Sequence, residues 1–321
     1  MRTIVHLLLV SMPWTLVAQA PTPPKDKSSI NWYFGNSGNG LRFGRLDAKP
    51  TVKNDKLPSF GSAGAGTVSD PVTGNLLFYT DGSQVVDVLG QPMPNGSGLS
   101  GNPASNQPVA VCPVPGQPGK YFIFTNSASV TAGGSVTYSV VDMALFGNGI
   151  APAPGLGDVD PSRKNIGVPG LTGVSEAMIL VPHSNGTDFW LITQQFFSRN
   201  FSASLVSAAS YTAAAFPPTT TAVLTLPLVA SHLGYHQSSG KLAVACSRPP
   251  VDTPPPLTDA VILNFNAGSG ILTFNQYMFN SAVEGTNNQA IYDIEFSPDG
   301  KLVYYTVFDG TDPEFPSGLY R

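Results

Sequence analysis

Residues Phe296–Thr306 read FSPDGKLVYYT, a tight turn ending in Gly300 that is followed by one variable residue and an apolar run. The same element recurs upstream: Gly74 precedes Leu76–Tyr79, Gly119 precedes Tyr121–Phe124, Gly240 precedes Leu242–Ala245, and Gly186, with one extra residue, precedes Phe189–Ile192. Another apolar segment lies before each turn, as at Val109–Cys112, Ala177–Val181 and Ile291–Phe296. Two apolar segments joined by a short glycine turn predict a β-hairpin. The chain therefore contains five predicted hairpins.

The five glycines are separated by 45, 67, 54 and 60 residues. Repeats of this length are typical of propellers and solenoids, and the unequal intervals favour propeller blades with loop insertions. A second, more polar strand pair follows each hairpin: Val136–Val141 is one such strand, and Ala260–Phe265 with Ile271–Phe274 forms a complete pair. Four strands per repeat is the composition of a propeller blade. We therefore expect an all-β fold, a β-propeller of four-stranded blades with about five blades visible.

The composition supports a turn-rich, folded chain. Of the 321 residues, 42% are hydrophobic and 11% are charged, and there are 33 glycines and 30 prolines. This many turn formers favours short strands over long helices, and the apolar content is enough to bury a core. The formal net charge of −4 and the lack of a basic cluster argue against a nucleic-acid partner.

The first residues have the pattern of a signal peptide, which we predict to span residues 1–20. Arg2 gives a basic start, Ile4–Val10 an apolar run, and Val17–Ala20 small residues near a cleavage point, preferably after Ala18. An uncleaved anchor is the alternative, but the apolar run is short for a bilayer. Residues 21–29 are a polar linker, and residues 30–321 are assigned to the propeller. We therefore expect an extracellular or cell-surface protein with no membrane span after signal removal.

Both ends of the predicted propeller look incomplete. Trp32–Phe34 and Leu41–Phe43 resemble an outer strand pair without an inner hairpin before it. Ser317–Arg321 (SGLYR) resembles the opening of a third strand after the fifth hairpin. Propellers close by combining terminal strands in one blade. We therefore expect an open arc of blades with unpaired end strands, and a chain that is a fragment of a longer protein.

Five further stretches carry a family resemblance. They are INWYFGNSGNGLRF (residues 30–43), GNLLFYTDG (74–82), MPNGSGLSGN (93–102), YSVVDMALFGNG (138–149) and LVPHSNGTDFWLI (180–192). In this order they resemble the N-terminal propeller of large surface proteins from gliding, type IX-secreting bacteria. Phe296–Thr306 also resembles the strand motif of WD40-like, TolB-type propellers. The resemblance implies a roughly seven-bladed ring ahead of adhesion-type and sorting domains, and it carries over no catalytic residues.

The two cysteines, Cys112 and Cys246, both lie in apolar, strand-like runs. Export to an oxidising compartment would permit a disulfide between them, but two cysteines do not make a disulfide framework. We expect two buried, reduced thiols, with the disulfide as the alternative.

Three histidines remain beyond the predicted signal peptide. His232 and His236 are four residues apart and could face the same way on a strand, but no cysteine or carboxylate close in sequence completes a metal site. His183 lies in the turn HSNG, where it could pair with Glu176 or Asp188 for acid–base work. We expect structural roles for all three, with His183 bonded to local backbone.

Other candidate groups are weaker. The serines Ser175 and Ser184 lack the glycine pattern of a nucleophile elbow. Acidic side chains cluster near turns, at Asp70, Asp81, Asp299, Asp309 and Asp312. We expect Asp299 to bond turn backbone. Asp309–Asp312 could offer oxygen atoms to calcium, but it lacks the loop pattern of a calcium hand.

A sialidase-type site would need several converging arginines. The arginines Arg42, Arg45, Arg163, Arg199, Arg248 and Arg321 occupy no equivalent positions in the repeats. The aromatic residues Trp32, Trp190, Tyr304 and Tyr305 are expected in the core, with a sugar-stacking platform as the alternative. The loop Val251–Pro256 (VDTPPP) is stiff and suits recognition.

Two functions from different classes follow. The first is a non-catalytic secreted or cell-surface module that binds an unknown surface protein or a glycan. The second is a propeller-type hydrolase or lyase that acts on sugars or lactones. Charged residues that converge on the centre from several blades would favour the second, and the sequence repeats no charged position. We therefore expect the first function, and assign no catalytic, cofactor or metal residue.

Overall fold

The computed structural model describes residues 27–34, 38–44, 49–55, 60–61, 63–129, 131–150, 153–224, 228–247, 260–279, 290–308 and 318–320. The predicted signal peptide, residues 21–26 of the linker, the loop Val251–Pro256 and both Asp309 and Asp312 lie outside the described residues. The described part is all-β, as predicted, and its strand pairs are antiparallel.

The first two sheets are short. The first has the order β1 (Asn31–Tyr33), β2 (Gly40–Arg42) and β3 (Thr51–Lys53). The second has the order β4 (Gly66–Ser69), β5 (Leu76–Thr80), β6 (Gln84–Asp87) and β7 (Pro92–Ser97).

The third sheet is the largest, because one long strand belongs to two sets of neighbours. Its strands are β8 (Val109–Pro113), β9 (Lys120–Asn126), β10 (Gly134–Asp142), β12 (Ile166–Pro182), β13 (Phe189–Gln195), β14 (Asn200–Val206) and β15 (Pro218–Ala222), and the short β11 (Asp158–Val159) pairs with β10. The first half of β12 pairs with β10 and the second half pairs with β13, and the register shifts between Val174 and Met178. Each half thus completes a set of four strands, β8-β9-β10-β12 and β12-β13-β14-β15.

The last two sheets follow in sequence. One contains β16 (Val229–His236), β17 (Lys241–Ser247), β18 (Ala260–Asn266) and β19 (Ile271–Phe279), and the other contains β20 (Ala290–Phe296), β21 (Val303–Phe308) and β22 (Gly318–Tyr320). One α-helix, α1 (Ala208–Ala213), lies between β14 and β15, and two short 3-10 turns are formed by Pro161–Arg163 and Gln237–Ser239.

All five predicted hairpins are present, as the pairs β4–β5, β8–β9, β12–β13, β16–β17 and β20–β21. The glycines that end their turns, Gly74, Gly119, Gly186, Gly240 and Gly300, have φ angles of 72°, 77°, 76°, 62° and 67°. A side chain is disfavoured in this left-handed region, so the repeated glycine is required by the backbone.

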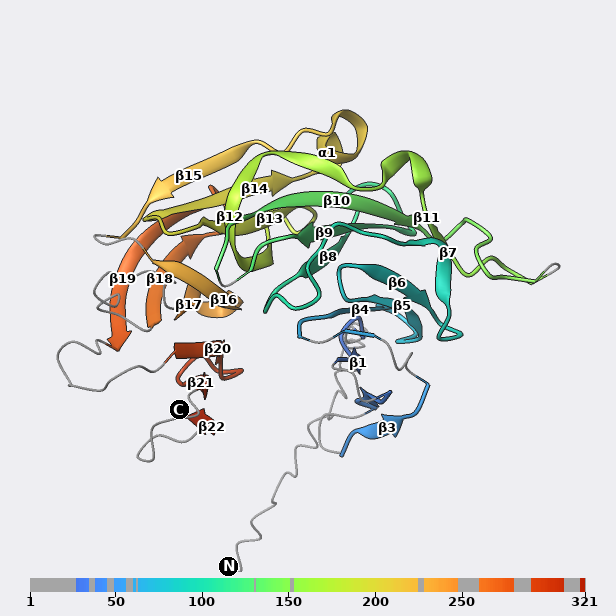
Figure 1. Ribbon diagram of the computed structural model, residues 1–321, viewed down its shortest axis with the longest axis horizontal. Helices are drawn as coiled ribbons and strands as arrows, with labels where there is room; N and C mark the ends of the chain where they lie inside the picture. The colour runs from blue at the N-terminus through green and yellow to red at the C-terminus, as the bar shows by residue number, and fades with distance from the viewer. Residues whose placement is uncertain are drawn as a thin grey trace, which may run out of the picture.

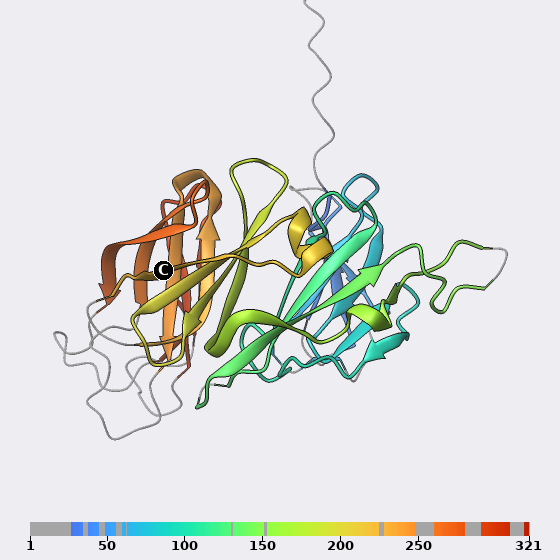
Figure 2. The ribbon, with the colours of Figure 1, turned by 90° about the horizontal axis from the view of Figure 1, so that it is seen from above.

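The sheets follow one another around an arc, with the N-terminal and C-terminal sheets at its two ends (Figure 1). The strands β1, β4, β8, β12, β16 and β20 pack in succession along its inner side. Seen from above, the sheets stand side by side (Figure 2). Among the described strands no sheet closes on itself.

The ends of the arc differ in part from expectation. The predicted strands around Trp32 and Leu41 are present, but a third strand, β3, joins them, and β1 contacts β4 just as β4 contacts β8. The strand β1 of the first sheet therefore belongs to the succession of inner strands, whereas the sequence had predicted only an outer strand pair here. At the other end, β22 pairs with β21, which confirms the third strand predicted at Ser317–Arg321.

The core consists of separate clusters between neighbouring sheets. Cys112 belongs to a cluster with Phe122, Phe124 and Tyr138, whereas Cys246 belongs to another with Leu242. Both thiols are buried. The two cysteines therefore line different cores, as expected for structural thiols.

Candidate functional site

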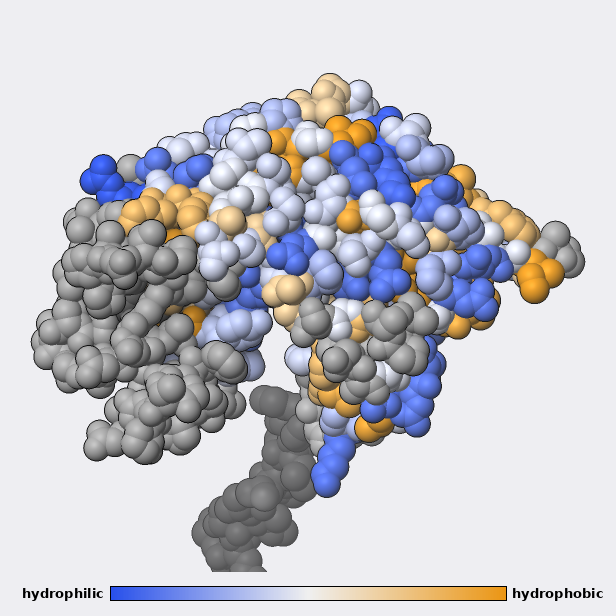
Figure 3. All heavy atoms as spheres, in the orientation of Figure 1, coloured by the Kyte–Doolittle hydropathy of each residue, from blue (hydrophilic) through white to orange (hydrophobic). Residues whose placement is uncertain are grey.

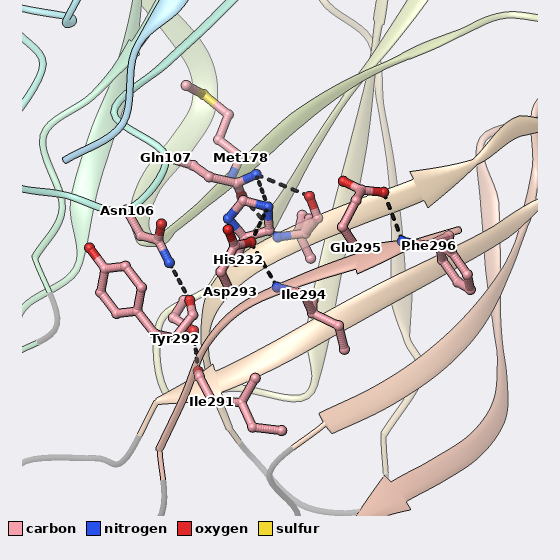
Figure 4. Close-up of polar contacts among 12 residues, drawn as sticks. Asn106, Gln107, Met178, His232, Ile291, Tyr292, Asp293, Ile294, Glu295 and Phe296 are labelled. Atoms are coloured by element: carbon pink, nitrogen blue, oxygen red, sulfur yellow. Dashed lines mark hydrogen bonds and ion pairs between the residues drawn. The ribbon is translucent and has the colours of Figure 1, made fainter. Parts of the chain in front are cut away.

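Polar side chains from several sheets meet on the inner side of the arc (Figure 4). We call this group the inner cluster; it consists of Asn106, Gln107, Glu176, His232, Tyr292, Asp293 and Glu295. Asn106 and Gln107 lie just before β8, Glu176 lies in β12, His232 in β16, and the other three in β20. The register shifts in β12, β16 and β20 fall at or beside Glu176, His232 and Tyr292, so β-bulges interrupt the regular ladder there.

Gln107 joins two sheets through its side-chain amide. Its Oε1 accepts hydrogen bonds from the backbone N–H of Met178 at 3.0 Å and of Leu233 at 2.9 Å. Its Nε2 donates to the carbonyl oxygen of Leu233 at 3.0 Å. The amide therefore supplies the hydrogen-bond donor and acceptor that the backbone of an adjacent strand would supply, and it connects β12 with β16.

Asn106 extends these contacts to a third and a fourth strand. Its side-chain Nδ2 donates to the carbonyl oxygen of Tyr292 in β20, and its backbone N–H donates to Oε2 of Glu176 in β12 at 3.1 Å. Residues 186 positions apart in the sequence are thus bonded directly. The segment before β8 holds the inner ends of the later sheets together.

Glu176 is a buried carboxyl group, with an exposed fraction of 1%. Burial raises its pKa, and the hydrogen bond from Asn106 opposes this rise. Its second oxygen, Oε1, is buried without a hydrogen-bond partner among the described residues. A buried carboxyl in this setting favours its neutral form.

His232 and Asp293 form a side-chain contact between β16 and β20. The distance from His232 Nε2 to Asp293 Oδ1 is 2.9 Å, and the same oxygen accepts from the N–H of Ile294 at 2.7 Å. Burial tends to raise the pKa of Asp293, but the hydrogen bond and the charge of His232, with the Ile294 N–H, outweigh it and lower the pKa. Since Asp293 accepts, Nε2 is assigned as the protonated nitrogen, which leaves Nδ1 buried without a described partner.

The cluster reaches solvent through β20. Tyr292 is 42% exposed, and its pKa is raised by burial and by the charges of Glu176 and Asp293. Glu295 accepts from the N–H of Phe296 at 3.0 Å, and burial raises its pKa. Within the described residues, no three His, Cys, Asp or Glu side chains are placed to hold a metal ion.

The other histidines do not join the inner cluster. His183 Nδ1 accepts from the backbone N–H of Asn185 at 3.0 Å, and its ring stacks on Trp190 with centroids 5.4 Å apart. This confirms the predicted contact with local backbone. Glu176 lies seven residues earlier on an extended strand, which places it roughly 20 Å away. The Glu176–His183 acid–base pair considered from the sequence is therefore not formed.

His232 and His236 have separate partners. His236 Nδ1 lies 2.8 Å from Ser239 Oγ and its Nε2 lies 3.3 Å from the carbonyl oxygen of Pro298, so it connects two turns. His232 instead contacts Asp293 and Gln107. The two do not form a shared ligand site.

The described carboxylates near turns accept hydrogen bonds from groups of the turns and of nearby loops. Asp299 accepts from the hydroxyl of Ser297 and the N–H of Lys301, as predicted. Asp81 bonds the N–H groups of Gly61, Ser83 and Gln84 in the same way.

The described arginines are also spread apart. Arg42 bonds Asn31 and the carbonyl oxygen of Gly74, whereas Arg163 lies 4.1 Å above the ring of Tyr211. They do not converge on a carboxylate.

The aromatic candidates fall into different environments. Trp190 is buried, and its Nε1–H donates to the carbonyl oxygen of Ala267 at 2.8 Å, so it belongs to the core as predicted. Trp32 is not in the core: 51% of it is exposed. Trp32 and Phe34 instead border a recess.

This recess, which we call the turn-side pocket, has a volume of about 1080 Å³. It is lined mostly by apolar groups near the hairpin turns of the first sheets, among them Trp32, Phe34, Pro71, Pro113, Tyr121 and Phe189. On the face shown in Figure 3, the surface is also indented between the two ends of the arc. Predominantly apolar concave sites with a few polar groups are where proteins bind small ligands.

Comparison with protein-family models gave no match, and comparison with curated proteins gave none either. In the part of the chain that the structure describes, no helix has the length and apolar character needed to cross a membrane.

Proposed function

We propose that the chain is a β-propeller module, exported to the cell surface or the medium, which binds a surface protein or a glycan without catalysing a reaction. The single observation that carries this proposal is the turn-side pocket, a recess of about 1080 Å³ bordered by exposed aromatic side chains. The succession of sheets along an arc, with one strand of each on the inner side, supports the propeller. The basic, apolar and small residues of 1–20 support export.

Binding is favoured over catalysis because side chains of the inner cluster form hydrogen bonds that hold strands of the fold together. The amide of Gln107 and the side chain of Asn106 bond backbone groups of other strands. Two further polar atoms of the cluster, Glu176 Oε1 and His232 Nδ1, are buried without a hydrogen-bond partner among the described residues. A catalytic acid or base must reach the proton that it transfers, and neither atom is open to a substrate in this conformation.

A propeller-type hydrolase or lyase acting on sugars or lactones is the second candidate, and one observation favours it. Glu176, His232 and Asp293 come from three inner strands, and His232 contacts Asp293 directly, which resembles the convergence of titratable groups expected for that class. A carboxyl with a raised pKa in the same cluster as a His–Asp pair is a combination that acid–base enzymes use.

The two candidates are separated by measuring binding and turnover on the same preparation of the full chain, purified from its native host. Binding to surface extracts and to a glycan array is expected, with no hydrolysis or elimination of lactone and glycoside substrates. Turnover that disappears in Glu176→Gln or His232→Gln would establish the enzyme and reject the binding module. N-terminal sequencing of the same material tests export, with a mature start near Gln19 or Pro21 expected.

A further inference from the structure

We propose that the turn-side pocket binds neutral carbohydrate. This inference rests on the proposed binding function and specifies its ligand. The pocket volume of about 1080 Å³ is at the upper end of small-ligand sites, large enough for several sugar rings.

The charge of the pocket argues for a neutral ligand. Among the described lining residues, Asp70 alone carries a formal charge, and no lysine, arginine or histidine is present to bind an anion. Asp70 Oδ1 is already engaged: it accepts from the N–H groups of Val72 and Thr73 and from the Thr73 hydroxyl. The lining therefore offers no charge for a sulfated or uronic-acid glycan, and little for a cation.

The aromatic residues supply flat apolar contact. Trp32 and Phe34 are two residues apart on an extended segment, so they share one face, and they are 51% and 47% exposed. The intervening Tyr33 is buried and stacks on Tyr79, with ring centroids 4.6 Å apart, which fixes the strand. The C–H faces of pyranose rings are apolar and pack on such rings, whereas their edges carry hydroxyls.

The polar groups favour sugar hydroxyls over a peptide. The N–H donors in the lining are used internally: Trp32 Nε1 donates to Ser29 O at 2.8 Å, and Asn31 Nδ2 donates to Ser69 Oγ and Gly74 O at 2.9 and 3.0 Å. The other polar side chains in the lining are hydroxyls, such as those of Thr67 and Tyr121. A hydroxyl donates or accepts as its partner requires, which suits a polyol better than the fixed groups of a peptide backbone.

The test is titration calorimetry of the full chain with α-1,4-glucan, β-1,4-glucan and β-1,4-mannan tetrasaccharides, and with a polyuronate tetrasaccharide. At least one neutral tetrasaccharide should bind, and the polyuronate should not. Trp32→Ala should weaken the binding by about tenfold or more, because the stacking surface is lost. Trp32→Phe should restore most of the affinity. Phe274→Ala, which removes an exposed aromatic residue of β19 outside the pocket lining, is the matched control and should bind as the parent does.

Each result bears on one claim. Neutral-glycan binding that survives Trp32→Ala overturns the pocket as the site and leaves the binding module intact. Tight polyuronate binding overturns the preference for a neutral glycan. Capture of a surface protein with no glycan bound overturns carbohydrate as the ligand. Both results leave the proposed binding module intact. Cleavage of a tetrasaccharide during the titration rejects the proposed function itself. Thermal unfolding of each variant shows that a loss of binding is not a loss of fold.

Discussion

The side-chain amide of Gln107 bonds both backbone groups of Leu233, a residue 126 positions later in the chain. Its oxygen accepts the N–H at 2.9 Å and its nitrogen donates to the carbonyl at 3.0 Å. The strand β12 lies between the two in sequence, and the same amide oxygen also accepts the N–H of Met178. One side chain thus connects the inner edges of two neighbouring sheets, where Met178 and Leu233 pair with a described strand on one side only.

Replacing Gln107 with alanine should destabilise the fold, because it leaves two N–H groups and one carbonyl without this partner. We expect the free energy of unfolding to fall by about 2 kcal/mol or more. The matched control is Gln91→Ala, since Gln91 is an exposed glutamine in a turn, and its loss should change stability by less than about 0.5 kcal/mol. Urea unfolding followed by circular dichroism measures both, and equal midpoints for the two variants would contradict the bridging role.

Glu176 should make the stability depend on pH. Burial raises the pKa of its carboxyl above the ordinary value of 4.5, so the folded chain holds the proton more tightly than the unfolded chain does. Between 4.5 and the higher folded-state pKa, the free energy of unfolding should therefore fall as the pH rises. Below this pH window the protonated Glu176 makes its full contribution to the free energy of unfolding. Above the window that contribution is completely lost.

The variant Glu176→Gln removes that titration while it keeps an oxygen that can accept from Asn106. Urea midpoints measured from about pH 4 to pH 8 should decline less steeply for the variant than for the parent chain. Glu295, whose pKa is also raised by burial, and Asp293 remain in both proteins, so the difference in slope belongs to Glu176. Parallel slopes would show that this carboxyl titrates normally.

The repeated hairpins could be predicted from the sequence because their information is local. A glycine with positive φ, such as Gly74 or Gly300, and the apolar runs on either side lie within about a dozen residues. The strand β3 and the first half of β12 were not predicted. The latter contains the stretch Gly167–Gly173, whose glycines and proline are typical of a loop. Pairing with β10 extends it, so tertiary context outweighs local preference.

No local sequence pattern predicts the inner cluster. Asn106 and Gln107 look like loop residues in the sequence, and their partners lie up to 186 positions away. His232 and Asp293 are 61 positions apart, whereas the potential ligand close to His232 in sequence is His236. The charged positions also differ from sheet to sheet, so a search for a repeated charge could not find them. Only the packing of the inner strands brings them together.

The two cysteines should resist labelling in the native protein. Burial raises the pKa of the Cys112 thiol, and both Cys112 and Cys246 are enclosed in separate cores. A maleimide should react slowly with the folded chain and rapidly with both thiols after unfolding without reductant. Fast native labelling would show that a core is open, and a failure to label after unfolding would reveal a disulfide.

The close approach of β16 and β20 gives the most specific prediction, at Gly234. A Cβ atom placed on Gly234 would lie 2.5 Å from the carbonyl oxygen of Ile294 and 3.3 Å from the Cα of Glu295. These are backbone atoms of the neighbouring sheet, so they cannot rotate away as a flexible side chain would. Gly234→Ala should therefore force the two inner strands apart and lower the free energy of unfolding by about 1–3 kcal/mol.

Gly167→Ala is the matched control, since Gly167 also lies in a strand and a Cβ atom there meets nothing within 4 Å. Its stability should equal or slightly exceed that of the parent chain, because alanine restricts the unfolded state more than glycine does. Hydrogen exchange in Gly234→Ala should rise first in β20 and β21, where the contact of His232 with Asp293 is lost along with the packing. Unchanged exchange in those strands, together with unchanged stability, would mean that β16 and β20 do not approach as closely as the geometry requires.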